Sequence, residues 1–237
     1  MVDLYGTNPE EVSTVRKTSD FIDKYDLTFE ENLKLFQDDL SDFIFNTAKI
    51  ENSQLSYLQT KDVIDGKSIP GQDPEDIIVV NNLRLACDYI QEHIHDKVSL
   101  DLASQLNKII VKSALIYRSS SKKSKETYGF EAQPWCLSPG IEDKVTTFID
   151  ELKELPSITD QAMSLWIYML KTRFFESGNK RTGLLLANLL MIQHGKGMIS
   201  IPANYLQDFK TQVTNYRETE DIEPLKQFIY DYCIQGK

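Results

Sequence analysis

One ten-residue stretch has the composition of an anion-binding turn. Residues 173–182 read Arg-Phe-Phe-Glu-Ser-Gly-Asn-Lys-Arg-Thr. Residues 177–179 readily leave the helical region of backbone space, and Lys180 and Arg181 follow directly. A turn that opens a helix presents unpaired backbone N–H groups and the positive end of the helix dipole, so this one could bind an anion, most naturally phosphate. A helix–loop–helix corner whose cations are merely solvated is the alternative that these residues leave open.

Helical patterns lead into this turn and out of it. Apolar residues at steps of three and four predict one helix before residue 173 and another after residue 182. We expect Thr159 to cap the first helix and Gly195 to end the second. The apolar positions are Leu165, Trp166, Met169 and Leu170 before the turn, and Leu184, Leu185, Ala187, Leu189 and Ile192 after it.

The rest of the chain also has the pattern of helices. Thr28 and Glu31 have capping-box spacing, and a buried stripe continues from them to about residue 50. Strand alternation is almost absent, so the sequence predicts an all-α fold. Helices are expected over residues 28–50, at 59–64, after the caps Asp73 and Ser99, after Gly140, from residue 201, and over 223–234.

Residues 117–138 differ from the helical segments. They are rich in serine and lysine, and they end with an aromatic and proline-containing stretch. This composition predicts a loop with a short hairpin around residues 128–130. Its three lysines are either solvated or face an anionic ligand; they are Lys122, Lys123 and Lys125.

Charge and composition argue against several classes of protein. The 237 residues include 26 cations and 36 anions, and a net charge of −10 does not suit a protein that grips nucleic acid. No apolar run reaches the ~18–20 residues of a membrane span. The polar N-terminus lacks the pattern of a secretory signal, so we expect a cytoplasmic protein without membrane contact. Cys87, Cys136 and Cys233 are expected to be free thiols, and neither they nor the three histidines have metal-site spacing.

The turn and the order of the helices resemble the Fic/Doc (Fido-domain) family. The family signature reads His-x-Phe-x-(Asp or Glu)-Gly-Asn-(Gly or Lys)-Arg, and the chain matches it at Phe175 and at residues 178–182. The similarity in element order extends from about residue 74 to 234. It implies an all-α, Fic-type helical core at residues 73–237 with a small flap hairpin. Residues 1–72 would be an N-terminal arm and helical extension of the same structural unit.

The resemblance also implies a nucleotide site. In the family the His takes a proton from a target hydroxyl, the acid holds Mg²⁺, and the Gly-Asn turn and the Arg hold phosphates. The usual outcome is transfer of AMP from ATP to a Ser, Thr or Tyr of another protein. The phosphate-binding positions of this chain would be Ser177, Gly178, Asn179, Lys180, Arg181 and Thr182.

The chain departs from the family at the positions that do the chemistry. Arg173 stands at the position of the catalytic His, and an arginine cannot act as a general base because it stays protonated. Ser177 stands at the position of the metal-binding acid and is a much weaker Mg²⁺ ligand than a carboxylate. Leu184 replaces the second Arg that many family members carry. The resemblance therefore implies ATP as a ligand but impaired transfer, with Mg²⁺ binding unsupported.

An N-terminal motif resembles the inhibitory helix of many Fic proteins, (Ser or Thr)-x-x-x-Glu-(Gly or Asn). Thr47, Glu51 and Asn52 fit this pattern. In the family this Glu occupies the γ-phosphate position and pairs with the second Arg, which is Leu184 here. If Glu51 reaches the site it needs another cation, and Arg173, Lys180 and Arg181 are the candidates. A solvated carboxylate at the end of a helix is the alternative.

The sequence is compatible with several functions. An AMP transferase would need a base that the signature does not supply. A pseudoenzyme would bind a nucleotide or only a partner protein without chemistry, and Arg173 could instead form a structural joint by pairing with Glu51 or Glu176. A Doc-like kinase toxin is favoured by Lys180 but meets the same objection as the transferase. The target or partner protein is unspecified, and a homo-oligomer is compatible with the sequence.

Overall fold

The structure is a computed structural model that describes the backbone of residues 21–120 and 140–236 and the side chains of these residues other than 113–120. The expected flap hairpin, its three lysines and the beginning of the N-terminal arm lie outside the described residues. Within them the chain forms ten α-helices, one 3₁₀ helix and a two-stranded sheet, which confirms the expected all-α class. No helix in the described ranges combines the length and apolar character needed to cross a bilayer.

The elements follow one another with short connections. The helices are α1 (Phe29–Asp38), α2 (Leu40–Ile50), α3 (Tyr57–Ile64), α4 (Pro74–Glu92), α5 (Leu100–Ser120), α6 (Glu142–Leu152), α7 (Ile158–Lys171), α8 (Asn179–Gln193), the 3₁₀ helix η1 (Ala203–Tyr205), α9 (Leu206–Thr219) and α10 (Glu223–Tyr232). The strands β1 (Met198–Ile199) and β2 (Ile234–Gln235) pair antiparallel.

The boundaries of several helices differ from the expectation, and three of these differences have a clear structural cause. The helix expected over residues 28–50 is two helices, because the backbone bends at Asp39 (φ −96°, ψ 10°), and the buried rings of Phe36 and Phe43 meet across the bend with centroids 5.5 Å apart. Ser157 caps α7 in place of Thr159: its Oγ accepts the Asp160 N–H at 3.0 Å. The last helix ends at residue 232, since the following residues pair with β1.

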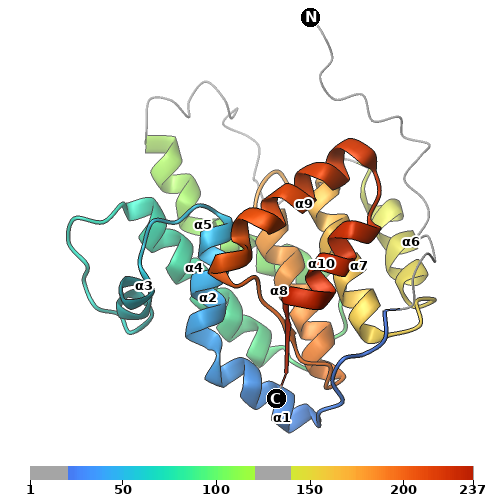
Figure 1. Cartoon of the computed structure of the whole chain (residues 1–237). Helices are drawn as coiled ribbons and strands as arrows, with labels where there is room; N and C mark the ends of the chain where they lie inside the picture. The colour runs from blue at the N-terminus through green and yellow to red at the C-terminus, as the bar shows by residue number, and fades with distance from the viewer. Residues whose placement is uncertain (1–20, 121–139, 237) are drawn as a thin grey trace, which may run out of the picture.

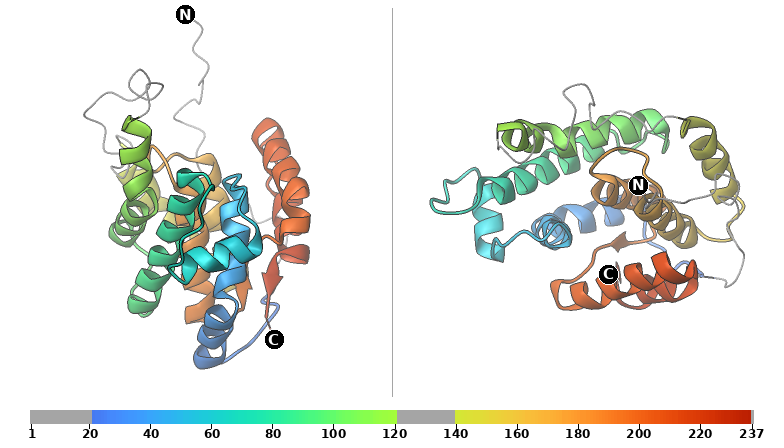
Figure 2. Two further views of the ribbon diagram at one scale, coloured as in Figure 1. Left: turned by 90° about the vertical axis from the view of Figure 1, so that its left-hand side faces the viewer. Right: turned by 90° about the horizontal axis from the view of Figure 1, so that it is seen from above.

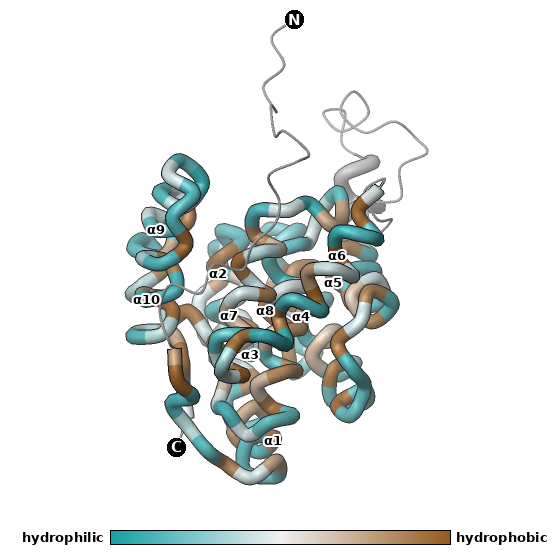
Figure 3. The backbone as a smooth tube through the Cα atoms, turned by 90° about the vertical axis from the view of Figure 1, so that its right-hand side faces the viewer, coloured by the Kyte–Doolittle hydropathy of each residue, from teal (hydrophilic) through white to brown (hydrophobic). Residues whose placement is uncertain are grey.

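Helices α7 and α8 form the centre of the molecule. Seen from above, they lie between α4 and α5 on one side and α9 and α10 on the other (Figures 1 and 2). Helix α8 is buried over most of its length, and an added Cβ at Gly183 would lie 3.0 Å from the Met169 Cβ of α7. By contrast, α9 is largely hydrophilic in Figure 3 and buries only Phe209 and Tyr216. The turn between α7 and α8 is therefore held by two closely packed helices.

The N-terminal extension is tied to the core at several points. The Leu27 N–H donates to the Gly195 carbonyl at 2.8 Å, and the Asn32 side chain donates to and accepts from the Gly197 backbone. These hydrogen bonds hold α1 against the end of α8.

A buried ion pair joins α7 and α10, with the Lys226 Nζ 2.6 Å from Asp160 Oδ1 and each side chain 3% exposed.

Candidate anion-binding site

The turn before α8 requires glycine at residue 178. Gly178 is the N-cap of α8 and has φ +80°, a region that other residues rarely adopt. An added Cβ would lie 2.8 Å from Asn107 Nδ2 and 2.9 Å from Val111 Cγ1. Glycine thus allows the turn to approach α5 closely.

The side chain of Asn179 stabilises the turn itself. Its Oδ1 accepts the Phe175 N–H at 3.0 Å, and its Nδ2 donates to the Phe175 carbonyl at 2.6 Å. The rings of Phe174 and Phe175 are buried beneath the turn. The Asn179 side chain is occupied by the backbone, so any anion here would meet the backbone N–H groups at the start of α8.

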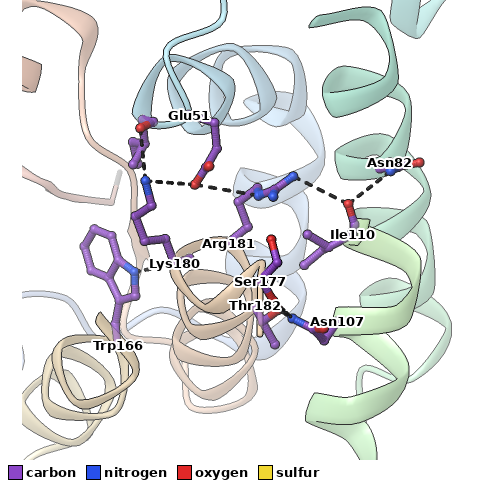
Figure 4. Close-up of polar contacts among 10 residues, drawn as sticks. Glu51, Asn82, Asn107, Ile110, Trp166, Ser177, Lys180, Arg181 and Thr182 are labelled. Atoms are coloured by element: carbon purple, nitrogen blue, oxygen red, sulfur yellow. Dashed lines mark hydrogen bonds and ion pairs between the residues drawn. The ribbon is translucent and has the colours of Figure 1, made fainter. Parts of the chain in front are cut away.

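Two cations in the first turn of α8 meet the C-terminal end of α2 (Figure 4). The Lys180 Nζ lies 3.2 Å from Glu51 Oε1 and 3.5 Å from the Ile50 carbonyl oxygen. The Arg181 Nε lies 3.7 Å from the same Glu51 oxygen, and Arg181 is only 6% exposed. The positive start of α8 therefore meets the negative end of α2, and Glu51 supplies a carboxylate between them.

Two side chains that no sequence motif predicted stabilise this arrangement by hydrogen bonds to the turn and to α8. Asn107 of α5 donates from Nδ2 to the Ser177 carbonyl at 2.8 Å and lies 3.1 Å from Thr182 Oγ1. The Trp166 indole N–H of α7 donates to the Lys180 carbonyl at 3.0 Å. The feature of the sequence that could have identified Asn107 is its place as a polar residue on the apolar stripe that includes Leu106.

A cavity of about 320 Å³ opens beside these residues. Ser177, Arg181, Glu51 and Asn52 line it, and the acidic start of α4 completes the wall. The acidic residues there are Asp73, Glu75 and Asp76. Among the residues that the structure describes, Arg181 is the only cation in this lining, so the described wall is predominantly acidic apart from the α8 end.

The residues of the turn do not fit the Mg²⁺ site that the family resemblance implies. Ser177 offers a neutral hydroxyl where the family has a carboxylate. Among the residues that the structure describes, no group of three or more His, Cys, Asp or Glu side chains has the arrangement of a metal site.

The other expected site residues are dispersed. Arg173 and Glu176 are both exposed. Thr47 is buried one turn before Glu51. Asn52 has a left-handed backbone (φ 67°), and its Oδ1 accepts a hydrogen bond from Lys210 of α9 at 2.7 Å. The structure brings together Glu51, Lys180 and Arg181, with Ser177 and Asn52 on the same cavity.

In the described part of the chain, no cysteine is suited to act as a nucleophile at this site. Cys87 and Cys233 are free and buried, while Cys136 lies outside the described residues. Burial raises the pKa of both thiols, that of Cys233 to about 12. A thiol with so high a pKa is not a nucleophile near neutral pH.

The comparison of sequences finds a distant relative. No family model matches the chain. The protein adenylyltransferase fic-1 of Caenorhabditis elegans is 20% identical over 197 residues. The match covers 79% of this chain but only 38% of the relative, so the chain spans well under half of that protein's length.

Solved structures show the same arrangement of elements. A fragment of Fic-1 from C. elegans has a TM-score of 0.68 at 16% identity, with 84% of this chain and 62% of the other covered. A Fic-domain-containing signalling protein from Bacteroides thetaiotaomicron has a TM-score of 0.65 at 15% identity, with 86% of each chain covered. The chain therefore has the fold of Fic-domain proteins, as the turn and the order of helices implied.

Proposed function

We propose that this chain is a Fic-type protein that binds the phosphates of a nucleotide, ATP in the first instance, at the start of α8. The observation that carries the proposal is the junction of Glu51 with Lys180 and Arg181. A carboxylate already lies against two cations at a helix N-terminus, where anions are stabilised. A phosphate that displaced this carboxylate would meet both cations and the backbone N–H groups beside Gly178.

Transfer of AMP to a protein hydroxyl would be impaired in this protein. Arg173 at the family His position cannot accept a proton. Loss of a general base typically costs about 10²–10⁴-fold in rate. Ser177 removes the carboxylate through which the family binds the metal, and the charge neutralisation supplied by a metal would be lost with it. The target protein, a homo-oligomeric state and a cytoplasmic location remain parts of this proposal.

Nucleotide binding is tested by titration calorimetry with ATP in EDTA and in Mg²⁺. We expect weak binding by the parent and at least tenfold tighter binding by Glu51→Gly, because the phosphates no longer compete with the carboxylate. Glu75→Gly is the matched control, since Glu75 lines the same cavity from α4. An equal gain from both variants would mean that general charge repulsion, and not the junction, limits binding.

Transfer is tested separately with ATP labelled on the α-phosphate and a cell lysate. Neither the parent nor Glu51→Gly should label protein at a rate near that of an active family member. Arg173→His combined with Ser177→Asp, in the Glu51→Gly background, should create labelling that the parent lacks. Strong labelling by the parent would refute the impairment and support an active transferase with an unassigned base.

A permanent structural joint is the second candidate, and the same junction favours it. Arg181 is almost fully buried and holds α2 to α8 through Glu51, so the contact could serve stability alone. In that case Glu51→Gly would lower the melting temperature and still fail to bind ATP. Binding of ATP by this variant would exclude a purely structural role.

A further inference from the structure

We propose that Asn107 is a positioning residue that keeps the anion-binding turn presenting an N–H group rather than a carbonyl oxygen. This inference rests on the proposed function, because it concerns how the same turn accepts phosphate. It concerns a residue of α5 that lies 70 positions away from the turn in the sequence. Asn107 acts on one peptide plane, the bond between Ser177 and Gly178.

The orientation of this peptide is set by the Asn107 side chain. A carbonyl oxygen only accepts hydrogen bonds, so the group that faces the Ser177 oxygen at 2.8 Å must be the amide nitrogen of Asn107. The described residues contain no cis peptide bond. In a trans peptide the C=O and N–H groups point in opposite directions. The Gly178 N–H consequently points away from Asn107 and from α5.

Glycine at this position makes such control necessary. With φ +80° at Gly178, the turn resembles a type II turn, whose flipped counterpart has φ near about −90° at the same residue. Glycine adopts both values readily, so the turn could interconvert at little steric cost. A flip would replace the donor on the anion side with the Ser177 carbonyl oxygen, whose partial negative charge repels phosphate.

The surroundings of Asn107 make it a rigid anchor. Its side chain is fully buried, and the same Nδ2 lies 3.1 Å from Thr182 Oγ1 in the first turn of α8. Thr182 is also fully buried, and its N–H makes the first backbone hydrogen bond of the helix, to the Gly178 carbonyl. One amide group therefore ties the turn peptide to the body of the helix that it precedes.

The test compares Asn107→Leu with Asn32→Leu, both in the Glu51→Gly background. Asn32 of α1 is an equally buried helical asparagine that donates to a backbone carbonyl, that of Gly197, away from the turn. Titration with ATP in EDTA is carried out at a temperature at which circular dichroism shows every variant folded. We expect the Kd to rise at least tenfold for Asn107→Leu and to stay within twofold for Asn32→Leu.

Crystal structures of the parent and of Asn107→Leu give a second readout that loss of stability alone would not change. The variant should show the Ser177 carbonyl turned away from α5 and a negative φ at Gly178. If Asn107→Leu does not fold, Asn107→Asp retains the shape, and its carboxylate should repel the Ser177 oxygen and produce the same changes.

An unchanged Kd in a folded Asn107 variant would overturn the inference, and so would a turn that keeps its orientation in the variant crystal. Equal weakening in Asn32→Leu would also overturn it, since the effect would then be one of general stability. If the Glu51→Gly parent binds no nucleotide, the proposed function fails. The crystal structures still decide whether Asn107 orients the peptide.

Discussion

Replacement of Glu51 by Gln should destabilise the protein and at the same time open the site to anions. The change removes the negative charge and keeps the shape of the side chain. Lys180 is 40% exposed at its side chain, so its pair with Glu51 contributes at most about 1 kcal/mol. Arg181 is different, because its side chain is only 7% exposed and would lose a carboxylate partner.

The expected loss follows from that contrast. At an effective dielectric constant of about 20, unit charges 4 Å apart attract by roughly 4 kcal/mol before desolvation is subtracted. Glu51 is itself about one-fifth exposed, and Gln can still offer an amide oxygen to Arg181. We therefore expect a net loss of about 1–3 kcal/mol in the free energy of unfolding. For a chain of this length that corresponds to a fall of about 2–4 °C in Tm for each kcal/mol.

Thermal unfolding with and without pyrophosphate measures both effects. Glu51→Gln should melt below the parent in plain buffer, and pyrophosphate should raise its Tm more than that of the parent. Asp38→Asn is the matched control, because it removes an exposed ion pair with Lys34, worth about 0.5 kcal/mol or less. If Glu51→Gln melts at the parent temperature and gains nothing from pyrophosphate, the junction neither stabilises the fold nor competes with anions.

Three further predictions concern other parts of the structure. Gly178→Ala should lower stability by about 1–3 kcal/mol and weaken ATP binding, because alanine is strained at φ +80° and its Cβ would contact Asn107; parent-like melting and affinity would contradict this. Lys226→Met should lower the free energy of unfolding by about 3–5 kcal/mol, because it leaves Asp160 buried without its cation. Lys226→Met combined with Asp160→Leu should recover much of that loss. Denaturant unfolding measures both variants, and no recovery would mean that packing dominates. Burial raises the pKa of Cys233 and of Tyr216 to about 12, from ordinary values of 9.0 and 10.0, so the folded state favours their neutral forms. Their contribution to stability is complete below pH 9 and is lost as the pH rises from about 9 to 12, and Cys233→Ala should flatten the lower part of that decline in urea titrations.

The sequence by itself determined the local features of this protein. Helix caps such as Thr28 and the spacing of apolar residues depend on neighbours a few positions away, so the class of the fold and most helix positions followed from them. The turn at Gly178 was predicted in the same way, since the two cations and the helical pattern that come after it mark the start of a helix. The bend at Asp39 did not follow, because it accompanies the packing of α1 against α8 and of α2 against α4, which lie far away in the sequence.

Tertiary structure decided which residues share the site. Glu51 meets Lys180 across 129 positions only because α1 packs against α8 and α2 packs against α4, which itself contacts α8. The sequence offered Arg173, Lys180 and Arg181 as equal candidates for that partner, and the structure places Lys180 Nζ at 3.2 Å and Arg181 Nε at 3.7 Å from Glu51. No sequence motif marks Asn107, and its contact with the turn arises from the close approach of α5 to Gly178. Hydrogen bonds and ion pairs depend on distances of a few tenths of an ångström, and for segments far apart in the chain those distances are set by the packing of the helices between them.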